Sequence, residues 1–428
     1  MKTKLCVALL GMLGMSVAEA RTLACGGLID VVSGKNLGPH LIEIDGNRIK
    51  SVRAGTAGAA AVIDQSAGVC VPGFIDLHTH IMNNESSPSS YVDGFRLNPA
   101  DYTIRAVNNA RKTLRAGFTT IRDLGDGDGV SVAVRNAINA GSVEGPRIYT
   151  SGKSIASTGG HADPTNGRNL DLTGDPGPRD GVINGADEAR KAVRQRYKEG
   201  SDLVKVTATG GVLSLAKNGL NPQFTEAEIA AVVETAKDYG MKVAAHAHGK
   251  EGMRRAIEAG VDTIEHGSFM DADLFPLMKQ HGTWYIPTLM AGWWTASKAE
   301  TPGYYPPMVA AKAKAIGPVM ASTFGKAHAA GVKIAFGTDS GVSPHGLNAK
   351  EFELMVKAGM TPAEALRSAT LHAAEVLDLS AELGTLEAGK LADIAVLEGD
   401  PLADITATTR VRLVIKDGQE FPGATASF

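Results

Sequence analysis

The stretch Gly73-Phe74-Ile75-Asp76-Leu77-His78-Thr79-His80 predicts a buried β-strand that ends in two histidines. Side chains two residues apart on a strand point to the same face, so His78 and His80 are expected to direct both imidazoles into one space. Imidazole is the commonest side-chain metal ligand. A His-x-His pair alone is weak evidence for a metal site, so the rest of the chain decides whether the pair has partners.

Eight strand-like runs in the middle of the chain alternate with helix-like segments or long loops. The predicted strands span residues 73–80, 118–124, 147–152, 203–209, 242–248, 262–267, 284–289 and 333–339. Helical patterns occupy residues 102–116, 186–199, 226–239, 250–259 and 309–330. The seventh strand is the weakest prediction because Pro287 interrupts it. Eight alternating β/α units predict a (β/α)8 TIM barrel.

Short strand patterns at both chain ends predict a second, smaller domain. The N-terminal runs are 23–29, 40–44 and 48–52, and the C-terminal runs are 391–397 and 411–416. The turn Asp45-Gly46-Asn47 joins two of the N-terminal runs as a hairpin. We therefore expect a β-sandwich domain built from residues 21–71 and 380–428, around a catalytic barrel of residues 72–379.

The first twenty residues predict an export signal. Lys2 and Lys4 precede an apolar run, and Ala18-Glu19-Ala20 has the small-x-small pattern of a cleavage site. We expect the mature protein to begin after Ala20 and to be periplasmic or secreted. In such a compartment Cys25 and Cys70 could pair, although two free buried thiols fit the sequence equally well.

The overall charge gives no reason to expect a nucleic-acid or membrane partner. The chain of 428 residues has a formal net charge of −3, with acidic and basic residues interspersed. No stretch beyond the export signal reaches the length of apolar residues that a membrane span needs.

Ionisable residues recur where the predicted strands end. Lys205 lies in the fourth strand, His246 and His248 in the fifth, His266 in the sixth and Asp339 in the eighth. Each has an ordinary alternative, such as a hydrogen-bonded structural histidine, a snorkelling lysine or a helix-capping aspartate. The carboxyl ends of barrel strands all face one point, so the residues together predict a metal site more strongly than any one alone.

This ordered set of residues resembles the amidohydrolase superfamily in its binuclear subtype. The segment Gly389-Lys390-Leu391-Ala392-Asp393-Ile394 also resembles the end of that superfamily's β-domain. The resemblance implies two divalent ions, with zinc the expected metal, and a lysine carboxylated by CO2 that bridges them. It assigns His78, His80 and Asp339 to one ion, His246 and His266 to the other, and the carboxylated Lys205 to both. His248 remains a second candidate on the fifth strand.

The same resemblance implies amide hydrolysis by a water that the two ions activate. Asp339 would accept the proton of that water and deliver it to the leaving nitrogen, so Asp339, Lys205 and His266 are the expected catalytic residues.

The segments 157–163, 209–212 and 337–341 resemble a narrower branch, which is imidazolonepropionase-like and prolidase-like. That branch contains dipeptidases and bacterial amidohydrolases that split ochratoxin A. It implies an N-acyl amino acid or dipeptide substrate with a free carboxylate, and a homo-oligomer for which an octamer is one arrangement.

The sequence suggests several substrate-binding residues without deciding among roles. His161 binds substrate or stabilises its loop, and Gly210 and His248 lie beside predicted ligands. Trp293 and Trp294 form either an apolar pocket wall or an oligomer contact.

Other functions remain open on the same fold. A mononuclear deaminase is disfavoured by Lys205 and by Gly249, which stands three residues after His246 where a glutamate would be expected. A lactonase would use the same water nucleophile on an ester. A non-catalytic binding or assembly barrel would be expected to lose ligands, and none is missing from the sequence.

Overall fold

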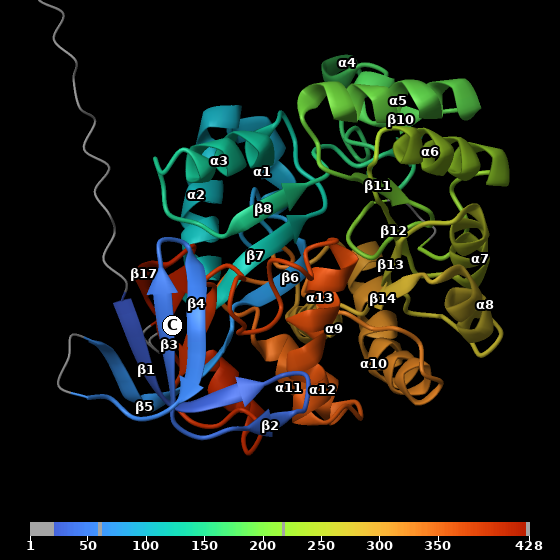
Figure 1. The fold of residues 1–428 in the computed structure, drawn as a ribbon. Coiled ribbons are helices and arrows are strands. Elements are labelled where there is room, and N and C mark those ends of the chain that lie inside the picture. Colours follow the sequence, from blue (N-terminus) through green and yellow to red (C-terminus); the bar gives the residue numbers. More distant parts are fainter. Residues whose placement is uncertain (1–20, 59–61, 216–218, 425–428) are drawn as a thin grey trace, which may run out of the picture.

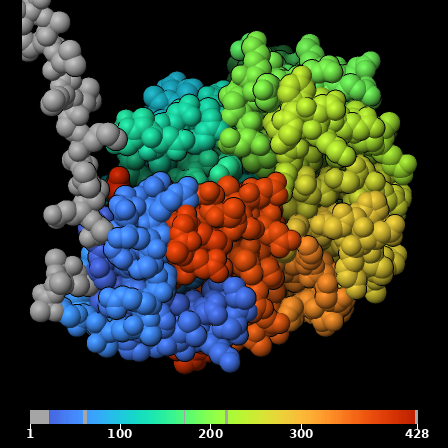
Figure 2. Space-filling model, in the orientation of Figure 1, coloured from blue at the N-terminus to red at the C-terminus, as the bar shows by residue number. Residues whose placement is uncertain are grey.

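The computed structural model describes residues 21–58, 62–215 and 219–424 (Figure 1). The export signal predicted for residues 1–20 lies outside the described residues. In Figure 2 the N-terminal part of the chain, in blue, lies on one side of the molecule, and the green and yellow middle of the chain lies on the other.

The two ends of the chain build a single eight-stranded sheet. Its strands are, in order, β17 (Gln419–Pro422), β16 (Val411–Lys416), β15 (Ile394–Leu397), β5 (Val62–Pro72), β1 (Arg21–Asp30), β3 (His40–Asp45) and β4 (Arg48–Ala54), with β2 (Lys35–Asn36) beside β1. The sheet curls on itself. This is seen where Ile49 of the edge strand β4 donates its N–H to the carbonyl of Lys390, in the segment before β15. Apolar residues from both chain ends fill the space inside, among them Leu23, Ile42 and Ile394.

A disulfide joins Cys25 of β1 to Cys70 of β5, with the two Cα atoms 5.8 Å apart. These strands run parallel to each other, and both cysteines are buried inside the curled sheet. Of the two alternatives that the sequence left open, the structure therefore has the paired one.

Gly73 connects the end sheet to the barrel. Its N–H donates to the carbonyl of Asp393, in the segment before β15. A Cβ at this position would lie 2.3 Å from Thr119 Oγ1, so a side chain does not fit where β5 passes into β6 (Phe74–Thr79). The close approach explains why glycine precedes the histidine-bearing strand.

The barrel contains two groups of parallel strands. The first is β6, β7 (Phe118–Asp123) and β8 (Arg147–Thr150), and the second is β11 (Val204–Thr207), β12 (Val243–Ala247), β13 (Thr263–His266) and β14 (Trp284–Ile286). Ile155 lies between the groups and pairs with Val206 of β11. β14 ends before Pro287, which has no N–H to continue the ladder.

The predicted eighth strand closes the barrel but is not a regular strand. Residues 333–340 make isolated parallel bridges, from Ile334 to β14 and from Ser340 to β6. The N–H of Leu77 donates to the Phe336 carbonyl over 3.0 Å, and the N–H of Asp339 to the His78 carbonyl over 2.7 Å. Asp339 has a left-handed backbone with φ of 59°, which ends the extended run.

Helices surround these strands in chain order. They are α1 (Ser90–Arg96), α2 (Pro99–Arg115), α3 (Val130–Asn139), α5 (Ala186–Glu199), α6 (Glu226–Asp238), α7 (Lys250–Ala259), α8 (Leu274–His281), α9 (Leu289–Ala299), α10 (Pro307–Ala329), α11 (Lys350–Lys357), α12 (Pro362–Ser368) and α13 (Leu371–Val376). Shorter elements are β9 (Ala156–Ser157), α4 (Leu170–Thr173), η1 (Pro178–Asp180), β10 (Val182–Ile183) and η2 (Ile405–Thr409). None of the helices among the described residues has the length and apolar character to cross a membrane.

The five predicted helices agree with α2, α5, α6, α7 and α10 to within three residues at each end. α6 shows why such boundaries can be read from sequence. Thr225 accepts a hydrogen bond from the N–H of Glu228, and the Glu228 carboxylate accepts one from the N–H of Thr225, which is a capping box. The predicted fold class is confirmed, whereas the domain limits at 71/72 and 379/380 stay predictions.

Replacing both Cys25 and Cys70 with serine is expected to lower the free energy of unfolding by about 2–4 kcal/mol, because the bond closes a long loop in the unfolded chain. Chemical denaturation of the variant and of the wild type, each with and without reductant, measures this. Equal stability of all four samples would contradict it.

Candidate active site

The carboxylate of Asp76 holds the end of β6 against the closing segment. It accepts hydrogen bonds from the N–H groups of His78 and Thr338 over 3.1 and 3.0 Å, and from the side chains of Thr338 and Asn348. Burial raises the pKa of Asp76 to about 6, although these four donors oppose the shift. Asp76 lies two residues before His78 on β6, so the two side chains point to the same face of the strand. Its bonds to Thr338 hold the residue directly before Asp339.

His78, His80 and Asp339 form a candidate metal centre. One ligand atom from each lies within 4.8 Å of the other two. Asp339 Oδ1 is 3.5 Å from His78 Nε2 and 3.3 Å from His80 Nε2. This oxygen is buried and makes no regular hydrogen bond within the described residues, which is the situation expected for a carboxylate oxygen that a cation would contact.

The other nitrogen of each of these imidazoles is already engaged. His78 Nδ1 donates to Glu265 Oε2 and His80 Nδ1 donates to the Gly125 carbonyl, both over 2.8 Å. In the neutral form of each ring Nδ1 therefore carries the proton, and Nε2 faces Asp339. A metal-binding histidine usually donates its second N–H in this way.

Lys205 lies in β11 beside this centre, with Nζ 3.4 Å from His78 Nε2. Burial lowers the pKa of Lys205 to about 8, against the opposing charges of Glu265 and Asp339. An amine with this pKa is partly uncharged near neutral pH, which is the form that reacts with CO2.

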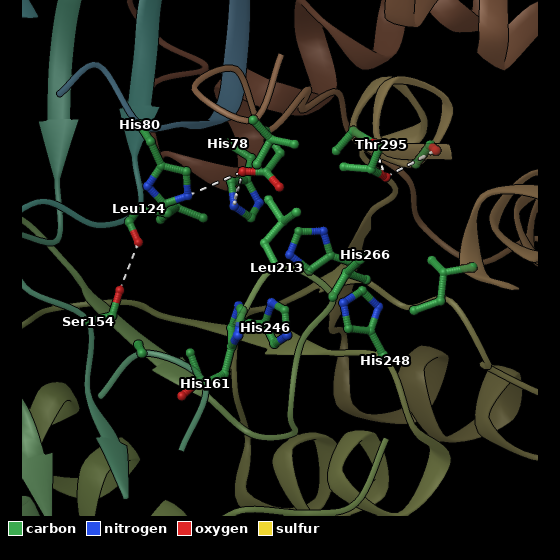
Figure 3. A pocket seen from close by; sticks show the side chains of 18 of the residues that line it. His78, His80, Leu124, Ser154, His161, Leu213, His246, His248, His266 and Thr295 are labelled. Atoms are coloured by element: carbon green, nitrogen blue, oxygen red, sulfur yellow. Dashed lines mark hydrogen bonds and ion pairs between the residues drawn. The ribbon is translucent and has the colours of Figure 1, made fainter. Parts of the chain in front are cut away.

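His246 and His266 lie in the same cavity, with ring centroids 4.6 Å apart, and the His266 centroid is 4.9 Å from that of His78 (Figure 3). His246 Nε2 donates to the Gly210 carbonyl over 3.0 Å, and His266 Nδ1 contacts Thr288 Oγ1 over 2.7 Å. Burial and neighbouring positive groups hold the pKa of both imidazoles well below the usual value, so both are neutral and have a lone pair to offer.

His161 and His248 complete the group of imidazoles. The His161 ring stacks on His246 with a centroid distance of 4.3 Å, and its Nδ1 is buried with no hydrogen-bond partner among residues 21–58, 62–215 and 219–424. His248 Nδ1 contacts Ser268 Oγ over 2.7 Å. Figure 3 shows both rings beside His246 and away from His80.

A cavity of about 220 Å³ brings most of the predicted site residues together. His78, His80, His161, Lys205, His246, His248, His266 and Asp339 all line it. One wall is mostly apolar. It comes from α9 with Ala291, from α10 with Ile316 and Met320, and from the loop after β11 with Val212 and Leu213. Gly210 contributes its carbonyl to His246 rather than a surface to the cavity.

The structure does not place Trp293 and Trp294 in the cavity wall. Ala291, Gly292 and Thr295 of α9 line the cavity. Because an α-helix has 3.6 residues per turn, the side chains at positions 293 and 294 point away from that face. Trp293 is 43% exposed and borders a separate apolar groove with Pro318 and Leu354. Neither tryptophan is among the described residues that line this cavity, and the oligomer contact, the other role that the sequence leaves open, stays a prediction.

A buried ion pair between Arg122 and Glu265, which was not predicted from the sequence, orients His78. Glu265 Oε1 accepts from the Arg122 guanidinium over 2.7 Å, while Oε2 accepts from His78. Burial raises the pKa of Glu265, but the charge of Arg122 and the bond from His78 outweigh it and bring the pKa to about 2. An acidic residue inside an apolar strand, directly before His266, was the available signal.

The fold and the arrangement of these side chains define a TIM barrel with a candidate metal site at the carboxyl ends of its strands. A sequence profile of the Amidohydrolase family matches residues 69–421. The chain belongs to this family and is a hydrolase that acts on amide bonds.

Known relatives agree with that membership. An ochratoxinase from Aspergillus niger is 35% identical over 373 residues, which cover 83% of this chain and 76% of the relative. The crystal structure of a Xaa-Pro dipeptidase with methionine bound in its active site is 46% identical, with a TM-score of 0.91 over 94% of this chain and all of that one. The crystal structure of the A. niger ochratoxinase is 31% identical, with a TM-score of 0.81 over 95% and 96%.

Glu265→Gln is expected to weaken metal binding by about 10–100-fold, because His78 loses the carboxylate that orients it. It also leaves Arg122 buried without its counter-ion, which is expected to cost about 3–5 kcal/mol of stability. Metal titration and thermal unfolding measure the two effects. The exposed Glu375→Gln serves as the control, and metal affinity equal to that control would argue against the role of Glu265.

Proposed function

We propose that the protein is a binuclear metal-dependent hydrolase of N-acyl amino acids or dipeptides with a free carboxylate, including ochratoxin A, which would give ochratoxin alpha and phenylalanine. The main support is the convergence of His78, His80, Lys205, His246, His266 and Asp339 on one cavity. The ochratoxinase and Xaa-Pro dipeptidase relatives support the choice of an amide beside an amino acid.

The donor set fits two divalent cations. His78, His80 and Asp339 would hold one ion, and His246 with His266 would hold the other, each histidine having its second nitrogen already engaged. Imidazole and carboxylate ligands suit Zn²⁺. Such ions, when bound, lower the pKa of water enough to supply a nucleophile near neutral pH and polarise the amide carbonyl.

Lys205 would join the two halves of the site. A lysine amine is a poor bridging ligand, whereas its carbamate offers two anionic oxygens. The position of Nζ beside His78, and the lowered pKa of the amine, support this modification. They also favour the binuclear arrangement over a mononuclear deaminase, which has no use for a bridging lysine.

Asp339 is placed to move the proton. Burial raises the pKa of its carboxyl, but the neighbouring imidazoles of His78 and His80 outweigh this and hold the pKa below the usual value. The carboxylate is therefore ionised and able to accept a proton from the attacking water, and then to donate it to the leaving nitrogen.

The lining of the cavity indicates which substrates fit. In the described part of the chain, Asp339 is the one carboxylate among the lining residues. A cationic substrate side chain would find no counter-ion there, whereas the wall from α9 and α10 suits an apolar or aromatic group. His161 and His248 are the neutral donors available to the substrate carbonyl or carboxylate.

We propose that the protein is exported, as the sequence predicts. The disulfide between Cys25 and Cys70 supports an oxidising compartment.

Assay of the metal-loaded mature protein against N-acyl amino acids, dipeptides, ochratoxin A and lactones tests the proposal directly. Lys205→Ala is expected to bind one ion or none instead of two and to lose most activity, because the two halves of the site lose their common ligand. Metal analysis and steady-state kinetics measure this, with the exposed Lys333→Ala as control. Full activity and two ions in Lys205→Ala would refute the bridging role.

The rate at which the Lys205 carbamate forms again in the metal-stripped protein is expected to depend on pH. The neutral amine of Lys205 reacts with CO2, and its fraction rises as the pH increases through about 8. At a fixed concentration of dissolved CO2, the rate of carbamate formation should therefore be about tenfold higher at pH 9 than at pH 7. Incorporation of ¹³C-labelled CO2 followed by NMR measures it, and a rate independent of pH would contradict it.

A further inference from the structure

A short loop after β11, residues 209–214, touches three of the histidines in the site. The Gly210 carbonyl accepts from His246 Nε2 over 3.0 Å, and Thr209 Oγ1 accepts from the N–H of His248 over 2.9 Å. Gly211 lies so close to His161 that an added Cβ would be 2.2 Å from the ring. The position of this loop therefore decides where two stacked rings, His161 and His246, can lie.

Lys312 of α10 holds this loop in place. Its ammonium donates to the carbonyls of Gly211 and Ser214, both over 2.8 Å. Tyr91 adds a longer bond of 3.3 Å from its hydroxyl to the Leu213 carbonyl. Because the lysine bonds are charge-assisted, they are stronger than bonds between neutral groups.

The lysine lies on the face of α10 that builds the site. Lys312, Ile316 and Met320 are spaced by four residues, which puts them on one side of the helix. Ile316 and Met320 line the cavity, and Val212 and Leu213 of the loop line it as well. Lys312 thus ties together the helix and the loop that form this wall of the cavity.

We propose that Lys312 is a positioning residue, which holds the 209–214 loop so that His246 keeps its Nε2 hydrogen bond and its Nδ1 lone pair faces the candidate metal centre. The inference rests on the proposed function only in taking His246 as a ligand. Within the described part of the chain, the bonds of Lys312 go to the loop carbonyls and not to the candidate ligands.

The role follows from how the loop is bonded. Without the ammonium, the Gly211 and Ser214 carbonyls lose their common donor and the loop can move away from His161. His246 then loses the fixed acceptor that sets its tautomer and orientation. Arginine can donate to two carbonyls at once from its planar fork, so it should restore part of the effect.

Two variants of matched chemistry test the proposal, Lys312→Met and Lys314→Met. Both lie on α10, but Lys314 is exposed and pairs with Glu300 on the surface. Hydrogen–deuterium exchange of peptides covering residues 209–214 reads the loop directly. Metal titration, thermal unfolding and separate measurement of kcat and KM read the consequences for the site.

Lys312→Met is expected to exchange faster in the loop, to bind metal about 10–100-fold more weakly and to lose kcat in proportion, with unfolding close to that of Lys314→Met. Lys312→Arg should lie between this variant and the wild type.

The proposal is overturned if Lys312→Met equals Lys314→Met in loop exchange or in metal affinity. It is also overturned if exchange rises throughout the barrel, since that result would mean a general structural role. A wild type without metal affinity would instead remove the proposed function, and the exchange of the loop would still decide whether Lys312 holds it.

Discussion

The chain of buried bonds from Arg122 through Glu265 to His78 is the constraint on which the rest of the site depends. Glu265 is fully buried, and such a carboxylate is tolerated only when it is paired and hydrogen-bonded. Arg122 supplies the charge and also donates to the Leu77 carbonyl, so the pair is tied to the backbone of β6 itself. With both oxygens of Glu265 occupied, His78 has one tautomer and one orientation, and its Nε2 must face Asp339 and Lys205.

The residues at the ends of the strands need backbone shapes that a regular strand does not have. His266, Thr288 and Asp339 all have left-handed backbones, with φ of 71°, 49° and 59°. A side chain directly after Glu265 would normally point to the opposite face of β13. The positive φ at His266 ends the strand and lets both residues serve the site. Strained conformations of this kind persist only where surrounding bonds hold them.

The sequence predicted the barrel and the candidate ligands because both depend on local patterns. Apolar runs, turns and the position of each ligand after a strand are visible without the fold, so His78, His246 and Asp339 were found. Residues that act through contacts across the barrel were missed, because Arg122 meets Glu265 from another strand and Lys312 meets its loop from a distant helix. The sequence could not decide between the two roles of the tryptophans because the rotation of α9 is set by packing and not by composition.

Three separate sets of contacts orient the histidines of the site, and the independence of these contacts matters for function. His78 depends on an ion pair within the barrel, and His246 on a loop carbonyl. His266 depends on Thr288, which precedes α9, and Glu351 fixes the start of that helix by accepting the N–H groups of Leu289 and Met290. Burial raises the pKa of Glu351 to about 8, although both N–H bonds oppose the shift, so this anchor does not need a counter-ion. Because each imidazole has its own support, the walls that receive substrate can vary while the candidate metal ligands keep their places.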